Sequence, residues 1–370
     1  MRLFWIAYRD WLAARGFELH ILRKYPFLYE EIWSPPPSTC PAPLPYAERC
    51  AEDASGSRPP SPYLKCAPAQ DKLGRDVTIK LVNTYNHEYH IYQDLLRCPE
   101  LFAQDFQGVL PPVAILDTPH RFSFVVMPTW GDYNPLNTLG TVGQVVTFMH
   151  CTLQDIDEHN IMNNIYSLWE YGPAFAPTLA QHRRTSRVLY CLFDFNLSVQ
   201  FPLDKPLHEC RLIADPSTMS GTPYGPLDVS LGVYDYDPFA YDVACLGNMF
   251  RAQFANITGS IPEFAPLFDK MTTHDIRDRF TASEALAHFD QAVSRLPYHT
   301  LEEEAVLDTD WEWDWEDTDR YWSLIPPELA ATWEDYRTPP SSLKQRFLWY
   351  IFRYRVGRTL LRYVRHKLHI

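Results

Sequence analysis

Glycine is scarce in this sequence, with 14 residues against 32 prolines among 370. Apolar side chains make up 46% and aromatic side chains 15%, a composition that excludes a disordered chain. A chain of this length can bury a large core, arranged as one large domain or as two lobes with extensions. The prolines indicate extended connections between the packed parts.

Clustered cysteines are also lacking. The eight cysteines lie far apart, without a C-x-x-C pair and without a Cys/His cluster at the spacing of metal ligands. Reduced and mostly buried thiols are therefore the favoured interpretation. They are Cys40, Cys50, Cys66, Cys98, Cys151, Cys191, Cys210 and Cys245.

Long apolar runs are missing as well. The apolar stretch from Leu3 to Ala7 is soon interrupted by Arg9 and Asp10, which makes it too short for the core of a signal peptide. No run reaches the roughly 18 apolar residues of a membrane helix. We therefore expect an intracellular protein, cytoplasmic or nuclear, without signal peptide or transmembrane helix.

An excess of basic residues is absent. The 33 Lys and Arg residues face 46 Asp and Glu residues, which gives a formal net charge of -13. A nucleic-acid-binding face needs clustered Lys and Arg, so we expect no nucleic-acid partner. Much of the acidity is local, because thirteen acidic residues and a single Arg lie between Leu301 and Asp335.

The order of local patterns predicts a small sheet lobe followed by a larger helical lobe. Aromatic residues at helical spacing up to Gly16 predict an N-terminal helix that packs on the rest of the protein. Composition then divides the chain into a helical extension (1–33), a Pro-rich linker (34–62), the small lobe (63–130), the large lobe (131–297), an acidic aromatic segment (298–342) and a basic amphipathic helix (343–370).

The small lobe has the predicted order β-β-α-β-β. Two strands, 63–67 and 77–82, flank a polar turn that contains Gly74, and a helix follows from His87 to Arg97. Two further strands are predicted at 113–116 and 122–127. The clearest helices of the large lobe are predicted at 142–149, 242–254, 264–271 and 281–296.

Several polar residues of the lobes stand at positions that suit phosphate chemistry. Lys80 ends an apolar strand and Glu88 lies on the next helix, a pairing that is commonplace when it stands alone. Asp155 can orient the proton of an attacking hydroxyl, and Asn160, five residues later, can ligate a phosphate-bound Mg²⁺. For this pair taken alone, an ordinary helix-capping turn is the slightly favoured interpretation. Asp194 ends another apolar strand.

Taken in order, six motifs over about residues 63–295 resemble the eukaryotic protein-kinase family. Residues 77–80 resemble the V-A-I-K strand, 88–91 the helix-C glutamate motif, 155–160 the D-x-x-x-x-N of the catalytic loop, 194–196 the D-F-G motif, and 241–247 and 278–286 two landmarks of the helical lobe. More narrowly, residues 8–17, the missing glycine loop and the long insertion between 160 and 194 resemble fungal (basidiomycete) kinase-like proteins.

The resemblance implies an α+β, bilobal protein-kinase-like fold, with a small antiparallel β lobe and a larger, mainly helical lobe. It implies ATP and Mg²⁺ as cofactors. Lys80 would hold the α- and β-phosphates and pair with Glu88, and Asp155 would position the acceptor hydroxyl. Asn160 and Asp194 would bind Mg²⁺. The backbone of Met127, at the start of a hinge that extends to residue 131, would contact adenine.

The sequence also departs from the family pattern. Residues 56–62 stand where the glycine-rich loop is expected but contain a single glycine, and Leu153-Gln154-Asp155 replaces H-R-D. Two functions follow as alternatives. One is ATP- and Mg-dependent phosphoryl transfer to a protein hydroxyl, Ser or Thr by family default. The other is a catalytically inactive pseudokinase that acts as a binding scaffold. The retained polar groups favour the enzyme, because positioning and charge neutralisation carry phosphoryl transfer.

The two C-terminal segments carry opposite charges. The acidic segment alternates acids with Trp and Tyr, whereas residues 343–370 carry eight Lys or Arg residues among apolar ones. The favoured interpretation is that they pack on each other or on the helical lobe. In a second interpretation, residues 343–370 lie on an anionic membrane surface. A third is an interaction module that presents the acidic aromatic arm to a protein partner.

Overall fold

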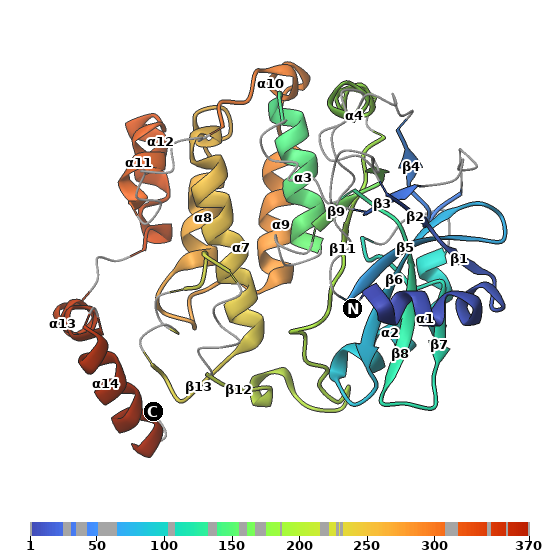
Figure 1. Ribbon diagram of the computed structural model, residues 1–370. Helices are drawn as coiled ribbons and strands as arrows, with labels where there is room; N and C mark the ends of the chain where they lie inside the picture. The colour runs from blue at the N-terminus through green and yellow to red at the C-terminus, as the bar shows by residue number, and fades with distance from the viewer. Residues whose placement is uncertain are drawn as a thin grey trace. The chain divides into compact units, whose positions relative to one another are not determined.

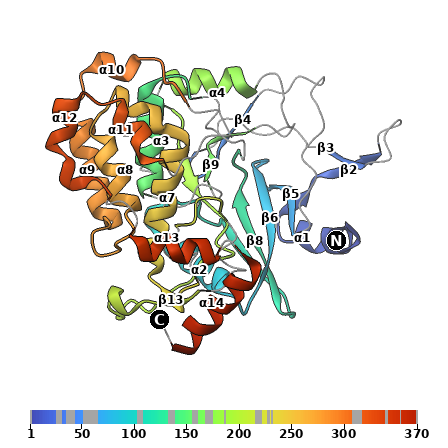
Figure 2. The ribbon, with the colours of Figure 1, turned by 90° about the vertical axis from the view of Figure 1, so that its left-hand side faces the viewer.

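The computed structural model describes most of the chain (Figures 1 and 2). The described residues are 2–24, 31–34, 43–50, 65–102, 108–131, 139–154, 161–166, 175–185, 187–214, 222–226, 229, 232–307, 317–338, 342–352 and 354–368. The chain divides into two compact units. Unit 1 comprises Met1–Thr138 and Asn160–Gln200, and unit 2 comprises Leu139–His159 and Phe201–Ile370.

Unit 1 is built on a five-stranded antiparallel sheet. Its strands, in spatial order, are β1 (Phe17–Leu19), β5 (Cys66–Asp71), β6 (Asp76–Asn83), β8 (Phe122–Pro128) and β7 (Ala114–Asp117). Helix α2 (His87–Arg97) follows β6 in the chain, so the predicted order β-β-α-β-β is confirmed. The predicted bounds of α2 are confirmed as well.

The turn between β5 and β6 shows why these residues form a hairpin. The carboxylate of Asp71 accepts hydrogen bonds from the backbone amides of Leu73, at 2.9 Å, and Arg75, at 3.0 Å. Gly74 adopts a φ of 73°, a conformation that glycine reaches without steric cost. Because the side chain of Asp71 holds its own turn closed, the two strands pair in a single register.

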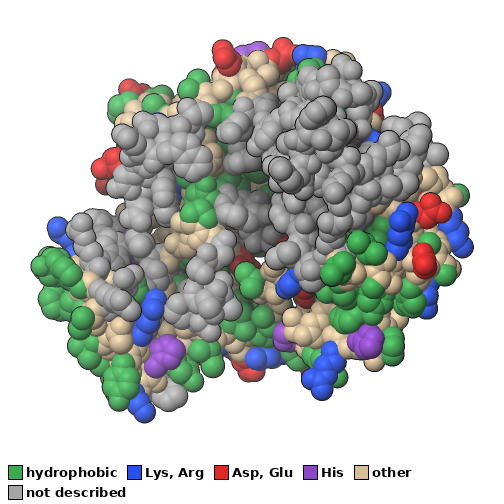
Figure 3. Space-filling model, viewed as in Figure 1, with side chains coloured by type: hydrophobic (Ala, Val, Ile, Leu, Met, Phe, Trp, Pro, Cys, Tyr) green, Lys and Arg blue, Asp and Glu red, His purple; other side chains and the backbone are tan. Residues whose placement is uncertain are grey.

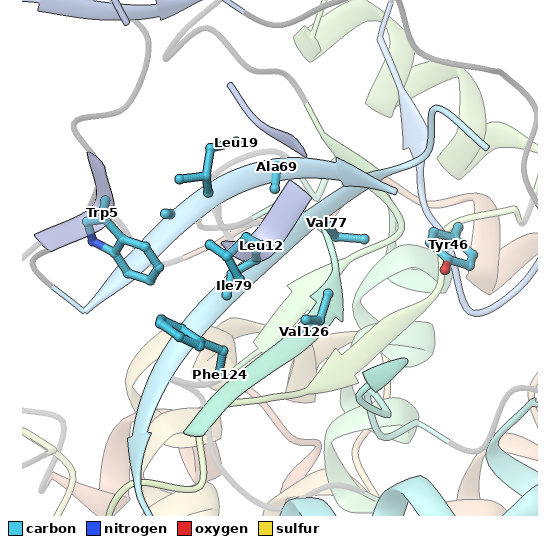
Figure 4. Packing of buried hydrophobic residues seen from close by; sticks show 10 residues of the cluster. Trp5, Leu12, Leu19, Tyr46, Ala69, Val77, Ile79, Phe124 and Val126 are labelled. Carbon is cyan, nitrogen blue, oxygen red and sulfur yellow. The ribbon is translucent and has the colours of Figure 1, made fainter. Parts of the chain in front are cut away.

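Helix α1 (Arg2–Ala13) covers one face of the sheet. Trp5 and Leu12 are buried against Ile79 of β6 and Phe124 of β8 (Figure 4). Tyr8 adds an edge-to-face contact with the ring of Phe124, at 5.1 Å between centroids. The prediction of a packed N-terminal helix is therefore confirmed.

The rest of the N-terminal extension differs from the prediction. Helix α1 ends near Gly16, as predicted. The extension to residue 33 was assigned as helical, but the chain turns at Gly16, where φ is 93°, and forms β1. A hairpin of β2 (Ile21–Lys24) and β3 (Glu31–Ser34) follows. Leu19 of β1 is buried among the residues that α1 covers, and β1 pairs with the open edge of β5. Strand formation satisfies the backbone groups of that edge, which a helix could not do.

A buried carboxylate ties distant parts of unit 1 together. Asp76, the first residue of β6, accepts hydrogen bonds from Gln70, at 2.9 Å, and from the hydroxyl of Tyr166, at 2.7 Å. Arg49 donates to the same carboxylate from 3.3 Å, and Nε2 of His20 lies 3.5 Å from it. Four segments of the chain therefore converge on one side chain.

Two small ribbons complete the described strands of unit 1. Strand β4 (Glu48–Arg49) pairs in parallel with β10 (Ile165–Tyr166), and β9 (Ile161–Asn163) pairs antiparallel with β11 (Tyr190–Leu192). Helix α4 (Phe175–Arg184) lies in the insertion between β10 and β11, and a short 3-10 helix spans Pro99–Phe102.

Unit 2 is mainly helical. Its central helices α3 (Val142–Gln154), α7 (Pro238–Phe254), α8 (Phe264–Thr272) and α9 (Ala282–Val293) lie side by side (Figures 1 and 2). The four predicted helices are confirmed, although α3 continues five residues beyond the predicted end. The remaining elements among the described residues are β12 (Leu212–Ile213), β13 (Asp235–Tyr236), α10 (Tyr298–Glu302), α11 (Thr318–Ser323), α12 (Pro327–Thr332), α13 (Leu343–Phe352), α14 (Arg355–Leu368) and 3-10 helices at Leu207–Glu209, Ala255–Gly259 and Glu334–Tyr336.

Helix starts in unit 2 follow from local sequence. Asp237 caps α7 by accepting bonds from the backbone amides of Phe239 and Ala240, and Pro238 occupies the first helical position. Thr281 and Glu284 form a capping box at the start of α9. Across the described helices of both units, none is long and apolar enough to cross a membrane.

Candidate functional site

Lys80 projects from the centre of the sheet towards the face that carries α2. Side chains alternate along β6, so Val77 and Ile79 join the cluster under α1 while Val82 joins the cluster under α2. Lys80 lies two positions before Val82, so its side chain points to the same face of the sheet as Val82. Only 7% of its surface is exposed. An ammonium buried to this extent needs charged partners.

Glu88 supplies one of those partners. It lies in the first turn of α2, where the positive end of the helix dipole favours a carboxylate. Lys80 Nζ donates a short hydrogen bond to Glu88 Oε1, and the carboxylate is as buried as the lysine, at 6% exposed. The predicted pairing of Lys80 with Glu88 is therefore present in the structure.

Asp194 supplies the second partner from far along the chain. Its Oδ1 accepts a hydrogen bond of 2.6 Å from Lys80 Nζ, and the Asp194 side chain is 29% exposed. Its φ of 60° makes it the single non-glycine residue with positive φ among the described residues. Such backbone conformations persist where the surroundings enforce them, and they cluster at active sites.

The neighbours of Asp194 hold it in place. Phe195 is buried, and its ring meets that of Tyr92 edge-on, with centroids 5.5 Å apart. Tyr92 lies one turn after Glu88 on α2, so this contact attaches the chain after Asp194 to the helix that carries Glu88. On the other side of Asp194, the backbone of Leu192 exchanges hydrogen bonds with Gly108 and Leu110.

The two carboxylates decide the protonation of Lys80. Burial by itself would lower the pKa of Lys80, but Asp194 and Glu88 more than offset that effect and raise the pKa above its usual value. The lysine is therefore an ammonium at neutral pH. Cys66, the strand partner of Lys80, shows the opposite balance, because burial outweighs the nearby ammonium and raises the pKa of its thiol to about 11. The Cys66 side chain, which lies beside Lys80, is therefore uncharged at neutral pH.

The segment after β8, the predicted hinge, forms hydrogen bonds with other residues of unit 1. Met127 is 5% exposed and belongs to the hydrophobic cluster that also contains Tyr92 and Phe195. The amide of Thr129 donates to the carbonyl of Asp76 at 3.1 Å. Trp130 Nε1 donates to the carbonyl of Pro45 at 2.7 Å. The expected adenine contact by Met127 concerns its backbone and stays a prediction.

Sequence reasoning missed Asn163, whose neighbours give no motif. Asn163 is 1% exposed and exchanges two backbone hydrogen bonds with Gly131, at 2.9 and 3.0 Å. Its side-chain oxygen accepts from the amide of Ile165. A Cβ at Gly131 would collide with the carbonyl oxygen of Ile165, so only glycine lets the hinge approach this ribbon.

The predicted catalytic-loop pair lies outside the described residues, since neither Asp155 nor Asn160 is among them. Within the described part of the chain, no group of three or more His, Cys, Asp or Glu residues could hold a metal ion. Asp194 does offer a partly exposed carboxylate, the hard oxygen donor that Mg²⁺ prefers. The donor chemistry at Asp194 thus fits Mg²⁺, and the second predicted ligand, Asn160, is untested.

The structure therefore brings together three of the predicted site residues, Lys80, Glu88 and Asp194, within hydrogen-bonding distance. Lys80 and Asp194 are separated by 114 positions in the sequence.

In comparisons with known proteins, no family model matches this chain, and no curated protein matches its sequence.

Proposed function

We propose that this protein is a kinase-like phosphotransferase, which uses ATP and Mg²⁺ to phosphorylate a protein hydroxyl. The observation that carries the proposal is the buried contact of Lys80 with both Glu88 and Asp194, made across a long stretch of sequence. A lysine kept charged and fixed by two carboxylates suits the binding of phosphate oxygens. Such positioning and charge neutralisation are most of what phosphoryl transfer requires.

Lys80 is oriented for that role by its two bonds. An ammonium has three N–H donors, so beyond the bonds to Glu88 and Asp194 a third donor serves a phosphate oxygen. Glu88 is buried and acts as a positioning residue that holds the Lys80 ammonium. Because the pKa of Lys80 is raised, this donor set persists throughout the physiological pH range.

Asp194 and Asn160 would hold the magnesium ion, which when bound neutralises the charge on the transferred phosphoryl group. Asn160 directly precedes Ile161 in the sequence. Ile161 pairs with Leu192, which lies two positions before Asp194. This register supports the pairing of the two predicted ligands. Asp155 would orient the hydroxyl of the acceptor.

The topology of unit 1 gives further support. Its antiparallel sheet with one helix after the lysine strand agrees with the small lobe that the resemblance implies. Unit 2 agrees in being mainly helical. Its buried Arg279, within the landmark at 278–286, donates to the backbone carbonyls of Thr273 and Ala240.

A pseudokinase scaffold is the second candidate. It is favoured by α3, which continues to Gln154 and so reaches the position where the family pattern has the arginine of H-R-D. The link from His150 to Asp155 is also shorter in the sequence than the family pattern has. The scaffold would keep the fold of both units without phosphoryl transfer.

Nucleotide binding tests the proposal first. We expect MgATP to raise the melting temperature of the wild-type protein and to bind in a calorimeter, and Mg²⁺-free ATP to bind more weakly. A ligand at about one hundred times its Kd stabilises a protein by about 2.7 kcal/mol. Asp194→Asn should remove the magnesium dependence of ATP binding. Lys80→Met should remove ATP binding itself.

The matched control is Asp10→Asn, which changes an exposed carboxylate of α1. It should bind MgATP like the wild type. Absence of MgATP binding in the wild type would refute the enzyme. Magnesium-dependent binding without transfer of labelled phosphate to Ser/Thr peptides or to the chain itself would favour the scaffold.

A further inference from the structure

Helix α14 presents its apolar side to solvent. At about 3.6 residues per turn, its large apolar residues fall on one side of the helix. Val356 is 80% exposed and Leu360 60% exposed. Tyr363, Val364 and Leu368 of the same side are exposed as well. This burial is the reverse of the pattern of a helix that packs into a core.

The basic side of α14 is the side that packs against the rest of unit 2. A Cβ placed on Gly232 would fall 2.7 Å from Cγ of Arg362. The rings of Tyr234 and His366 meet edge-on, with centroids 5.3 Å apart. Arg362 also lies over the ring of Phe352, which joins α14 to the end of α13. These contacts hold the helix so that its apolar side faces outwards.

Helix α13 extends the same surface. Leu343, Phe347 and Tyr350 are exposed, and Tyr354 in the connection stacks edge-on with Tyr350. We define the C-terminal surface as these four residues with Val356, Leu360, Tyr363, Val364 and Leu368. Figure 3 shows hydrophobic and basic side chains together over α13 and α14, at its lower left. An apolar surface of this kind marks an interaction site.

The charge of this segment identifies the chemistry of the partner. Residues 343–370 contain eight Lys or Arg residues and no Asp or Glu, in a chain whose formal net charge is -13. Arg346 and Lys367 are exposed beside the C-terminal surface. With these two cations at its border, the C-terminal surface suits a partner that is anionic and that also accepts large apolar and aromatic side chains.

The described part of the acidic aromatic segment is bonded elsewhere in unit 2. Tyr321 and Trp322 of α11 donate to the carboxylate of Asp269 on α8, at 2.6 and 2.8 Å. The amide of Thr338 donates to the same carboxylate. The described part of this segment therefore packs on the helical unit, as the favoured sequence interpretation held, and its two buried aromatic residues are committed there.

We propose that the C-terminal surface docks onto an anionic lipid bilayer. The aromatic and aliphatic side chains would enter the interface, and Arg346 and Lys367 would contact lipid headgroups. A nucleic acid would leave the apolar residues in water. A second copy of the chain would bring two strongly basic segments together, which like-charge repulsion opposes.

Co-sedimentation of the full chain with lipid vesicles tests this. We expect binding to vesicles of phosphatidylcholine and phosphatidylserine, weaker binding to phosphatidylcholine alone, and a decline with salt. Leu360→Ser with Val364→Ser should lower partitioning on the order of tenfold. Arg346→Gln with Lys367→Gln should also lower it on the order of tenfold, and only on anionic vesicles.

Leu203→Ser is the matched control, because Leu203 is a fully exposed leucine of unit 2 outside this surface. It should bind vesicles like the wild type. Circular dichroism and thermal unfolding are used to check that every variant is folded. Equal binding to neutral and anionic vesicles, or no sedimentation with either, overturns the proposal. A dimer in analytical ultracentrifugation that Leu360→Ser with Val364→Ser converts to a monomer would assign the surface to a second copy instead.

Discussion

At the scale of single residues, the site depends on charges that are buried together. Lys80 and Glu88 are almost completely removed from water, and Asp194 completes the group. Burying such a group costs desolvation free energy that its mutual attraction only partly returns, so its presence is weak support for a stabilising role. Its value lies in the fixed position of the ammonium.

Replacing Lys80 tests how strongly the group is coupled. Lys80→Met should lower the free energy of unfolding by about 3–5 kcal/mol, because it leaves the buried Glu88 carboxylate without its cation. Lys80→Met with Glu88→Gln should recover part of that loss. Chemical denaturation measures both, with the exposed Lys72→Met as the matched control. A double variant no more stable than the single one would show that the two residues are not coupled.

Asp76 carries a pH dependence of stability. Burial by itself would raise the pKa of Asp76, but the nearby His20, the hydrogen bonds from Tyr166 and Gln70 and the charge of Arg49 lower it below its usual value of 3.8. A carboxyl whose pKa is lower in the folded state stabilises the protein above its unfolded pKa. That stabilisation is lost as the pH falls through the folded value.

Asp76→Asn should therefore flatten the acid side of the stability curve. We expect the melting temperature of the wild type to fall more steeply below pH 3.8 than that of the variant. The comparison of melting temperatures between pH 7 and pH 2 measures the difference. Parallel curves for the two proteins would show that Asp76 has the same pKa in both states.

At the scale of elements, close approach of α7 and α8 depends on one glycine. A Cβ at Gly247 would lie 2.6 Å from Cβ of Met271 and 2.8 Å from Cγ2 of Thr272. Real side chains do not approach so closely, so the helices would have to separate. In unit 1, Gly131 has the same function between the hinge and β10.

Gly247→Ala should lower the free energy of unfolding by about 1–3 kcal/mol, in spite of the higher helix propensity of alanine, because it overpacks the interface. Gly259→Ala is the control, since nothing lies within 4 Å of the added Cβ. Urea denaturation compares the two variants. A Gly247→Ala protein as stable as the control would mean that α7 and α8 can separate without cost.

At the scale of the whole molecule, the two C-terminal segments differ in what they do for unit 2. Tyr321 is completely buried and Trp322 nearly so, both bonded to Asp269. Helices α13 and α14, in contrast, expose most of their large apolar residues. The acidic aromatic segment contributes buried side chains to the core of unit 2. Helices α13 and α14 lie on the surface of that unit.

Two truncations separate these roles. A chain that ends at residue 338 should keep the melting temperature of the wild type and its MgATP binding, and should lose vesicle binding. A chain that ends at residue 303 should be less stable by at least about 3 kcal/mol, because it removes two large buried aromatic side chains. Thermal unfolding measures both. Equal stability of the two truncated chains would show that α11 contributes nothing to the core.

The sequence by itself predicted the local elements and the three residues that meet at the candidate site. The β-β-α-β-β order, α2 and the helices of unit 2 could be predicted because hydrophobic periodicity, turn residues and caps act within a few residues. Glu88 was found because it begins such an element, Asp194 because it follows one, and Lys80 because it stands within an apolar strand. The roles of Asp155 and Asn160 stay predictions.

Only the tertiary structure decided what depends on distant partners. The pairing of β1 with β5, the convergence of four segments on Asp76 and the contact of Gly131 with Asn163 join residues far apart in sequence. The outward apolar side of α14 is of the same kind, because its periodicity shows that one side is apolar but not which side the body covers. Strand pairing and burial are properties of the assembled chain, and no local pattern encodes the partner.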